Sequence, residues 1–186
     1  MKLKSRLPAS AVVLWLCMSA SSQAQLTIHY DFTPGSIVPD GNGQLAIVQN
    51  LGGLAGLSSI TDVNARLNLT TGNAGDPMFL GDLYSSLTFG NTSETQSTAV
   101  LLNRPGRDNG NAFGSSLSSL NVTLDDSAAT NVFATTSSTG TYQADGRLSV
   151  NPNAAGVAFA AGSNGLSALN VTPPASNRVS LLVADY

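Results

Sequence analysis

Aspartate and asparagine side chains in two loops are the first candidates for a functional site. Calcium binds through several oxygen ligands, which carboxylates, amide side chains and backbone carbonyls supply. One loop contributes Asp108 and Asn109, and a second contributes Asp125 and Asp126. Their spacing matches no EF-hand loop, and aspartate also builds turns by accepting hydrogen bonds from backbone N–H groups. The sequence therefore leaves two interpretations open, a calcium site or a pair of turns that need no ion.

Nucleophilic catalysis has much less support in the sequence. A serine protease needs a nucleophile, a base that reaches it and a carboxylate that orients the base. His29 is the only histidine, and its neighbours alternate as they do at an exposed strand position. No G-x-S-x-G turn is present. We therefore expect that the protein is not an enzyme, that it has no catalytic residues and that it binds no cofactor apart from the calcium considered above.

Arg104 and Arg107 flank a Pro-Gly turn and also have two interpretations. In the first, they bind an anion or a partner molecule. In the second, they pair with Asp108 or Asp125 inside the domain. The second is favoured because acidic residues outnumber basic residues in this chain.

Strands are needed to position these loops, and the alternation of apolar and polar residues predicts where they lie. Residues 60–70 and 83–89 place apolar side chains on one face and polar side chains on the other. Further strands are predicted at 27–32, 44–50, 98–103, 121–124 and 179–185. The stretch 151–178 is predicted to be a long loop with one buried strand near 157–159. Many short strands separated by Gly and Pro turns indicate an all-β sandwich or barrel.

Residues 1–24 are predicted to be a signal peptide. Basic residues precede an apolar run at 9–18, which is too short to cross a bilayer as a helix. Small residues follow at Ser22 and Ala24, where a signal peptidase reads the chain. We therefore expect an exported chain without a stable membrane span after cleavage. Its expected location is the cell surface or the extracellular space, reached through the periplasm of a Gram-negative bacterium.

The predicted mature chain is acidic and lacks cysteine. Cys17 is the only cysteine and leaves with the signal peptide, as do both lysines. Five arginines then face 11 acidic residues, which gives a net charge of −6. Phosphate binding needs a basic surface, so nucleic acid and anionic lipid are not expected partners. Structural zinc and cysteine catalysis are not expected either, because no cysteine and no second histidine remain.

Several segments, taken in order, resemble the P domain (Homo B domain) that follows the catalytic domain in proprotein convertases and related bacterial subtilisin-like serine endopeptidases. The segments that carry the likeness are IVPDGNG at 37–43, GDLYSSLTFG at 81–90, TAVLLNRPG at 98–106, TGTYQADGR at 139–147 and SLLVADY at 180–186. The likeness covers nearly the whole predicted mature chain. It implies one domain, residues 25–186, with a jelly-roll β-sandwich fold that is galactose-binding-like or P-domain-like.

The chain is also similar to stand-alone P-domain-like proteins of Gram-negative bacteria, many of which carry a PEP-CTERM sorting tail. Members of this group usually follow the strand that resembles 180–186 with a Gly-rich turn and a last strand. The present sequence stops at Tyr186. The resemblance therefore predicts a domain that lacks its last strand, whose neighbours would keep unpaired backbone groups.

The resemblance implies a non-catalytic role. The leading hypothesis is an exported module that binds cell-surface or extracellular-matrix components or has a structural role among them. One alternative is an accessory domain that stabilises a subtilisin-like serine endopeptidase, which would then be its partner. Another alternative is a carbohydrate-binding jelly roll, although the sequence offers few aromatic residues for stacking on sugars.

Overall fold

The structure is a computed structural model that describes most of the chain beyond residue 28. The described residues are 29–31, 35, 37–41, 43–52, 57–73, 75–91, 93–94, 96–108, 110–148 and 164–186. The predicted signal peptide and the predicted strand at 157–159 lie outside these residues.

One sheet has four antiparallel strands in the order β1-β9-β4-β5. Their bounds are Gly43–Asn50 for β1, Leu83–Phe89 for β4, Ser97–Asn103 for β5 and Arg178–Asp185 for β9. The strand nearest the end of the sequence, β9, is central and pairs with β1 on one side and β4 on the other. Therefore both edges of β9 are already used.

The second sheet has three strands in the order β2-β7-β8. These strands are Ala65–Thr70 for β2, Ser119–Leu124 for β7 and Thr139–Tyr142 for β8. β7 is antiparallel to β2 and parallel to β8. A two-residue pair joins β3, Met78–Phe79, to β6, Ser116–Leu117.

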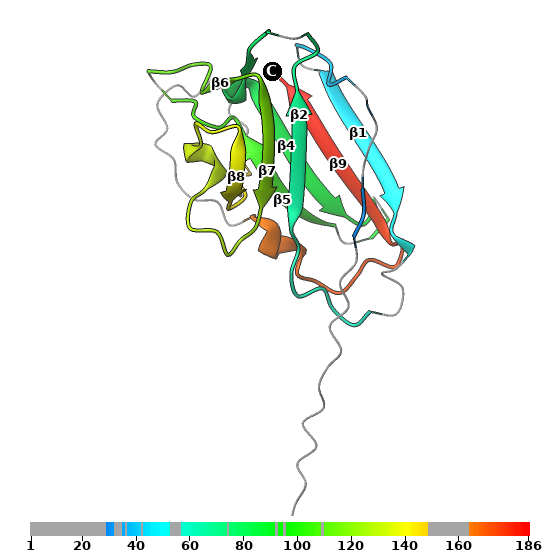
Figure 1. Ribbon diagram of the computed structural model, residues 1–186. Helices are drawn as coiled ribbons and strands as arrows, with labels where there is room; N and C mark the ends of the chain where they lie inside the picture. The colour runs from blue at the N-terminus through cyan, green and yellow to red at the C-terminus, as the bar shows by residue number, and fades with distance from the viewer. Residues whose placement is uncertain are drawn as a thin grey trace, which may run out of the picture.

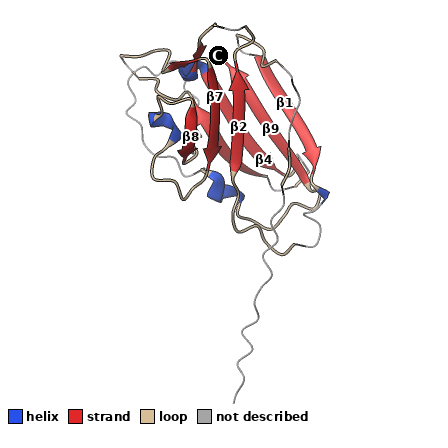
Figure 2. Ribbon diagram, in the orientation of Figure 1, coloured by secondary structure: helices blue, strands red, loops and turns tan. Residues whose placement is uncertain are grey.

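The helices in the described part of the chain are short 3-10 turns (Figure 2). They are η2 at Leu80–Asp82, η3 at Val132–Ala134 and η4 at Leu166–Leu169. The fold is therefore all-β, as the sequence predicts.

The three-stranded sheet lies over the four-stranded sheet, and the apolar core fills the space between them (Figure 1). Alternation explains which residues reach this core. In β7, Leu120, Val122 and Leu124 are buried and the intervening residues are not. In β4, Leu83 and Leu87 point inward from the other sheet. Each sheet thus contributes an apolar face to the core, and neither sheet can bury that face alone.

Most predicted strands are confirmed, with the following differences. Residues 60–70 form a strand only from Ala65 onward, because the preceding residues have no paired neighbour strand among the described residues. The described residues at 29–31, inside the predicted strand 27–32, are not in a strand. The strands β3, β6 and β8 are additional. Within 151–178, the described residues contain η4, which the sequence did not indicate.

The loop between β5 and β6 is fixed against η2 by close backbone packing. The N–H of Gly81 donates to the carbonyl of Phe113 at 2.9 Å. Gly114 has a φ of +65°, and a Cβ there would lie 2.2 Å from the carbonyl oxygen of Pro105. Only glycine fits such a contact, because its backbone tolerates positive φ and it carries no Cβ. The Arg-Pro-Gly turn therefore has one defined position.

Removing a core leucine tests the shared core. Leu120 is 0% exposed, and Leu148, which serves as the control, is 62% exposed. We expect Leu120→Ala to lower the free energy of unfolding by about 2–5 kcal/mol, because the deletion loses buried surface and leaves a cavity. Leu148→Ala should change it by less than about 0.5 kcal/mol. Urea unfolding measures both, and equal effects would contradict the assigned core.

Candidate functional site

Asp108, the first of the predicted calcium ligands, closes a tight turn in the loop between β5 and β6. One carboxylate oxygen accepts hydrogen bonds from the N–H groups of Gly110 and Asn111, both at 2.8 Å. The amide of Asn111 donates to the carbonyl of Gly114 and ties the turn to the fixed loop. Asn109 lies outside the described residues. The structure therefore gives Asp108 a turn-forming role that uses its carboxylate.

Asp125 and Asp126 follow the end of β7 and also bind backbone N–H groups. Asp125 accepts from the N–H of Ser127 at 2.7 Å, and these Ser127 hydrogen bonds lower the pKa of Asp125. The carboxylate of Asp126 accepts from the N–H groups of Leu166, at 3.1 Å, and Ser167. Asp126 thus satisfies the free N–H groups at the start of η4, which lies far away in the sequence.

The two predicted loops do not come together. The loop with Asp108 leads into β6 just before β7, whereas Asp125 comes directly after β7 (Figure 1). A strand rises about 3.3 Å per residue, so the six residues of β7 separate the loops by roughly 20 Å. Among the described residues, no three or more His, Cys, Asp and Glu side chains are grouped to hold a metal ion.

The most strongly organised polar cluster contains Asp145 and Arg147, which no pattern in the sequence singles out. Asp145 is 1% exposed, and Arg147 binds it through two contacts, Nε to Oδ1 at 2.6 Å and Nη2 to Oδ2 at 2.7 Å. The Arg147 guanidinium also lies over the ring of Phe133, 4.4 Å from its centroid, and donates to the carbonyl of Asn103. Such a two-contact pair is stronger and more directional than a single hydrogen bond.

This cluster covers the outer edge of β5. The N–H groups of Asp145 and Gly146 donate to the carbonyls of Leu101 and Val100, at 3.2 and 3.0 Å. The side chain of Asn103 donates to the carbonyl of Arg147 at 3.0 Å. Burial raises the pKa of Asp145, and the hydrogen bonds and charge of Arg147 act in the opposite direction. The arrangement is that of a structural clamp, because the carboxylate is fully occupied and inaccessible.

Arg104 is held inside the domain. It has a φ of +57° and is 6% exposed. Its Nε donates to the carbonyl of Gly81 at 2.7 Å, and its Nη2 lies 3.7 Å from Oδ1 of Asp82. Its guanidinium also faces the ring of Tyr186 at 5.8 Å from the centroid. The internal pairing predicted for Arg104 is therefore confirmed, but its partner is Asp82 and not Asp108 or Asp125.

Carboxylates gather at this end of the four-stranded sheet. Burial raises the pKa of Asp82, while the charge of Arg107 lowers it and that of Asp40 raises it. Burial also raises the pKa of Asp185, and the negative charges of Asp82 and Asp40 raise it further. Ionised carboxylates here therefore repel one another, and only partial compensation comes from arginine.

His29, the only histidine, is exposed and lies in no described strand. In the described part of the chain, no helix combines the length and the hydropathy that a membrane crossing needs.

Three comparisons with known proteins identified no similar protein. A scan against protein-family models, a search of curated proteins and a search of solved structures each found no match. The resemblance to P domains therefore stays a prediction from the sequence.

A calcium titration tests the role of the two loops. We expect calcium to leave the melting temperature unchanged, because the carboxylates of Asp108, Asp125 and Asp126 already accept backbone N–H groups. Differential scanning calorimetry with calcium and with a chelator is the measurement. A rise in melting temperature would contradict this expectation, since a ligand of the folded state stabilises it. Loss of that rise in Asp108→Asn or in Asp125→Asn would then identify the loop.

Neutralising Asp185 tests the carboxylate cluster. Its folded pKa lies above the unfolded value, so the ionised carboxylate opposes folding at neutral pH. Well below the ordinary aspartate pKa of 3.8 both states are protonated and the penalty disappears. We expect Asp185→Asn to raise the melting temperature at pH 7 and to leave it unchanged well below pH 3.8.

Asp125→Asn is the matched control for this experiment, because the pKa of Asp125 is lowered in the folded state. Its ionised carboxylate supports folding at neutral pH, so this variant should lower the melting temperature there. The same sign of change in both variants would contradict the assigned environments.

Proposed function

We propose that this chain is a non-catalytic, exported module with a jelly-roll, P-domain-like fold that binds cell-surface or extracellular-matrix components. In this proposal the domain works through its surface. It supplies a rigid body with a defined shape, and it transfers no group and makes no covalent bond.

The observation that carries this proposal is the way the polar residues are used. The carboxylates of Asp108, Asp125 and Asp126 accept backbone N–H groups, and that of Asp145 is clamped by Arg147. Catalytic carboxylates need access to a substrate and a proton to exchange. In the described residues, these groups instead hold loops and strand edges in place, which suits a binding or structural module.

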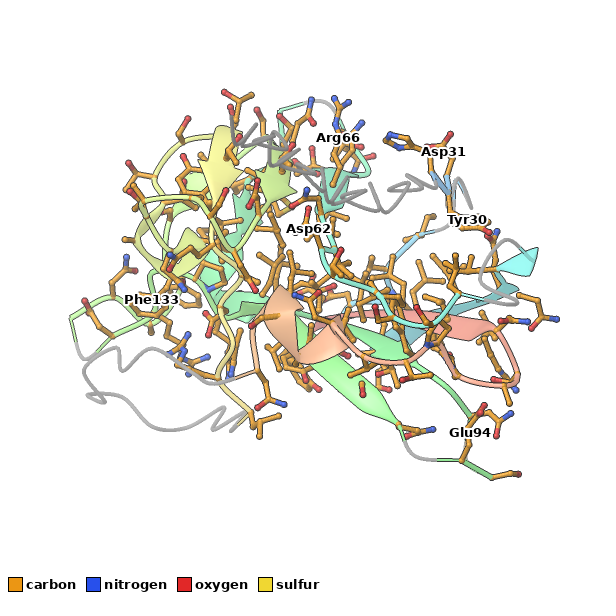
Figure 3. The ribbon with its side chains drawn as sticks, turned by 90° about the horizontal axis from the view of Figure 1, so that it is seen from below. Tyr30, Asp31, Asp62, Arg66, Glu94 and Phe133 are labelled. Atoms are coloured by element: carbon orange, nitrogen blue, oxygen red, sulfur yellow. The ribbon has the colours of Figure 1, made fainter. Side chains whose placement is uncertain are left out.

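The carbohydrate-binding alternative has one supporting observation, the outward face of the three-stranded sheet. The strand register places Arg66, Thr123 and Thr141 in one row and Asn68, Asn121 and Thr139 in the next. Nε of Arg66, which is labelled in Figure 3, donates to the side chain of Asn121 at 3.0 Å. Hydroxyl and amide groups of this kind hydrogen-bond to sugars. When such groups repeat along the sheet, several weak contacts to one polysaccharide add up to a higher overall affinity.

Binding assays on defined fractions test the proposal and separate it from its alternatives. The fluorescently labelled chain is mixed with isolated cell envelope, with extracellular matrix and with a glycan array, and it is also assayed for peptidase activity. We expect saturable binding to envelope or matrix and no hydrolysis of peptide substrates. The third assay uses a subtilisin-like serine endopeptidase, whose thermal stability is measured with and without the chain.

Two variants sharpen the result. Asn68→Ala combined with Thr141→Ala removes exposed polar groups from the three-stranded sheet and should weaken binding only if a glycan is recognised there. Ser180→Ala alters the other sheet and serves as the control. Peptide hydrolysis would overturn the proposal. Stabilisation of the endopeptidase without envelope or matrix binding would replace it with the accessory-domain role.

A further inference from the structure

β1 forms one edge of the four-stranded sheet, and its outer backbone groups are unpaired among the described residues. The N–H of Leu51 donates to the carbonyl of Asn177 at 2.7 Å, which continues the pairing of β1 with β9. Antiparallel strands alternate between residues that bond the neighbour and residues that point away from it. Gln44, Ala46, Val48 and Asn50 therefore direct their N–H and C=O groups outward, and no described residue hydrogen-bonds to them.

The opposite edge of the same sheet is protected. There, besides the Asp145–Arg147 clamp, the N–H of Val100 in β5 donates to the carbonyl of Asn164 at 2.8 Å. The side chain of Asn164 also donates to the carbonyl of Thr98. The chain thus covers one edge of the sheet with its own backbone and side chains, while the described residues leave the other edge uncovered.

β1 also lacks the features that usually prevent strands from pairing at an edge. Its sequence, GQLAIVQN, contains no charged residue and no proline. Its pairing with β9 runs through all eight residues without a bulge. Val48 is 45% exposed, and Ala46 beside it is exposed as well. Natural proteins commonly block such edges with charge, proline, a bulge or a covering segment.

The residues of β1 are complementary to a second β1 that runs in the opposite direction. Two antiparallel copies of β1 can be related by a twofold axis that passes beside Ile47. In this arrangement the outward residues of one copy pair with those of the other, and all their outward N–H and C=O groups form hydrogen bonds. In this register Ala46 faces Val48 of the second copy, and Gln44 faces Asn50. Apolar side chains thus meet apolar ones, and amides meet amides that can hydrogen-bond to them. Ile47 meets its own copy on the inner side.

We propose that β1 is a homotypic interface, through which two copies of this chain join their four-stranded sheets into one continuous antiparallel sheet. The self-complementary order of apolar and amide side chains in β1 favours a second copy as the occupant. The net negative charge of the chain makes two copies repel each other, whereas β1 brings no carboxylate to the contact. The interface uses the same strand on both copies, so the assembly closes at a dimer. This inference goes beyond the proposed function, because it holds for any ligand of the module.

Sedimentation equilibrium of the whole chain, over a range of concentrations, tests this interface. We expect a monomer–dimer equilibrium for the unmodified chain. Val48→Lys should weaken dimerisation by about tenfold or more, because the two lysines become diagonal neighbours on one face of the joined sheet. Val48→Glu should weaken it similarly. An equimolar mixture of the two variants should restore dimers, since each lysine then lies diagonally opposite a glutamate.

Two further variants keep the result interpretable. Ala46→Pro removes one outward N–H and leaves the bonds from β1 to β9 intact, so it should also weaken the dimer without unfolding the domain. Thr141→Lys adds the same charge to an exposed position on β8 and should leave the dimer unchanged. Circular dichroism at low concentration confirms that each variant is folded.

Three results would overturn the proposal. The first is a chain that stays monomeric at all concentrations. The second is a dimer that Val48→Lys leaves intact while the variant remains folded. The third is assembly into open-ended oligomers, because the twofold pairing of β1 closes after two copies.

Discussion

The burial of one apolar face from each sheet is the constraint on which the rest of this structure depends. The core residues of β4 and β7 face each other across the sandwich, and Val132 of η3 and Leu166 and Leu169 of η4 join the same core. Cys17 is the only cysteine in the sequence, so no disulfide within the chain can share this task. With the strands fixed by their apolar faces, the polar groups at strand ends and edges must find partners locally or from distant segments, because an unpaired buried polar group is costly.

This requirement explains why the acidic residues and arginines serve the fold. Asp126 supplies acceptors to the start of η4, and Arg104 supplies a donor to the carbonyl of Gly81. Asp145 and Arg147 close the edge of β5, where a bare strand would otherwise expose its carbonyls. Each of these charges lies where strand geometry leaves a backbone group without a neighbour. A chain with so few charged residues thereby places several of them at structural positions.

The sequence allowed the regular part of this architecture to be predicted, because period-two alternation is a local signal. Leu83, Leu87 and Phe89 recur at spacings of two and four, and they lie inward as that pattern indicates. The polar clusters gave no such signal. Asp145 and Arg147 are close in sequence, yet their role depends on Asn103, 44 residues before Arg147. A two-residue strand such as β3 is also too short to show any period. Contacts of this kind follow from the assembled sheets and from no local pattern.

The backbone N–H and C=O groups at both edges of the four-stranded sheet need hydrogen-bond partners, and the two edges differ in how they obtain them. At β5 the outward backbone groups form hydrogen bonds with Asp145, Gly146 and Asn164, so this edge is not available to another strand. At β1, an uncharged and uninterrupted strand, the equivalent groups have no partner in the described part of the chain. Backbone hydrogen bonds provide affinity along an extended strand, and the alternate side chains provide register. Since β9 is paired on both sides, β1 is where this sheet can grow. The specificity of that growth then depends on whether a neighbouring strand matches the order of apolar and amide side chains around Ile47.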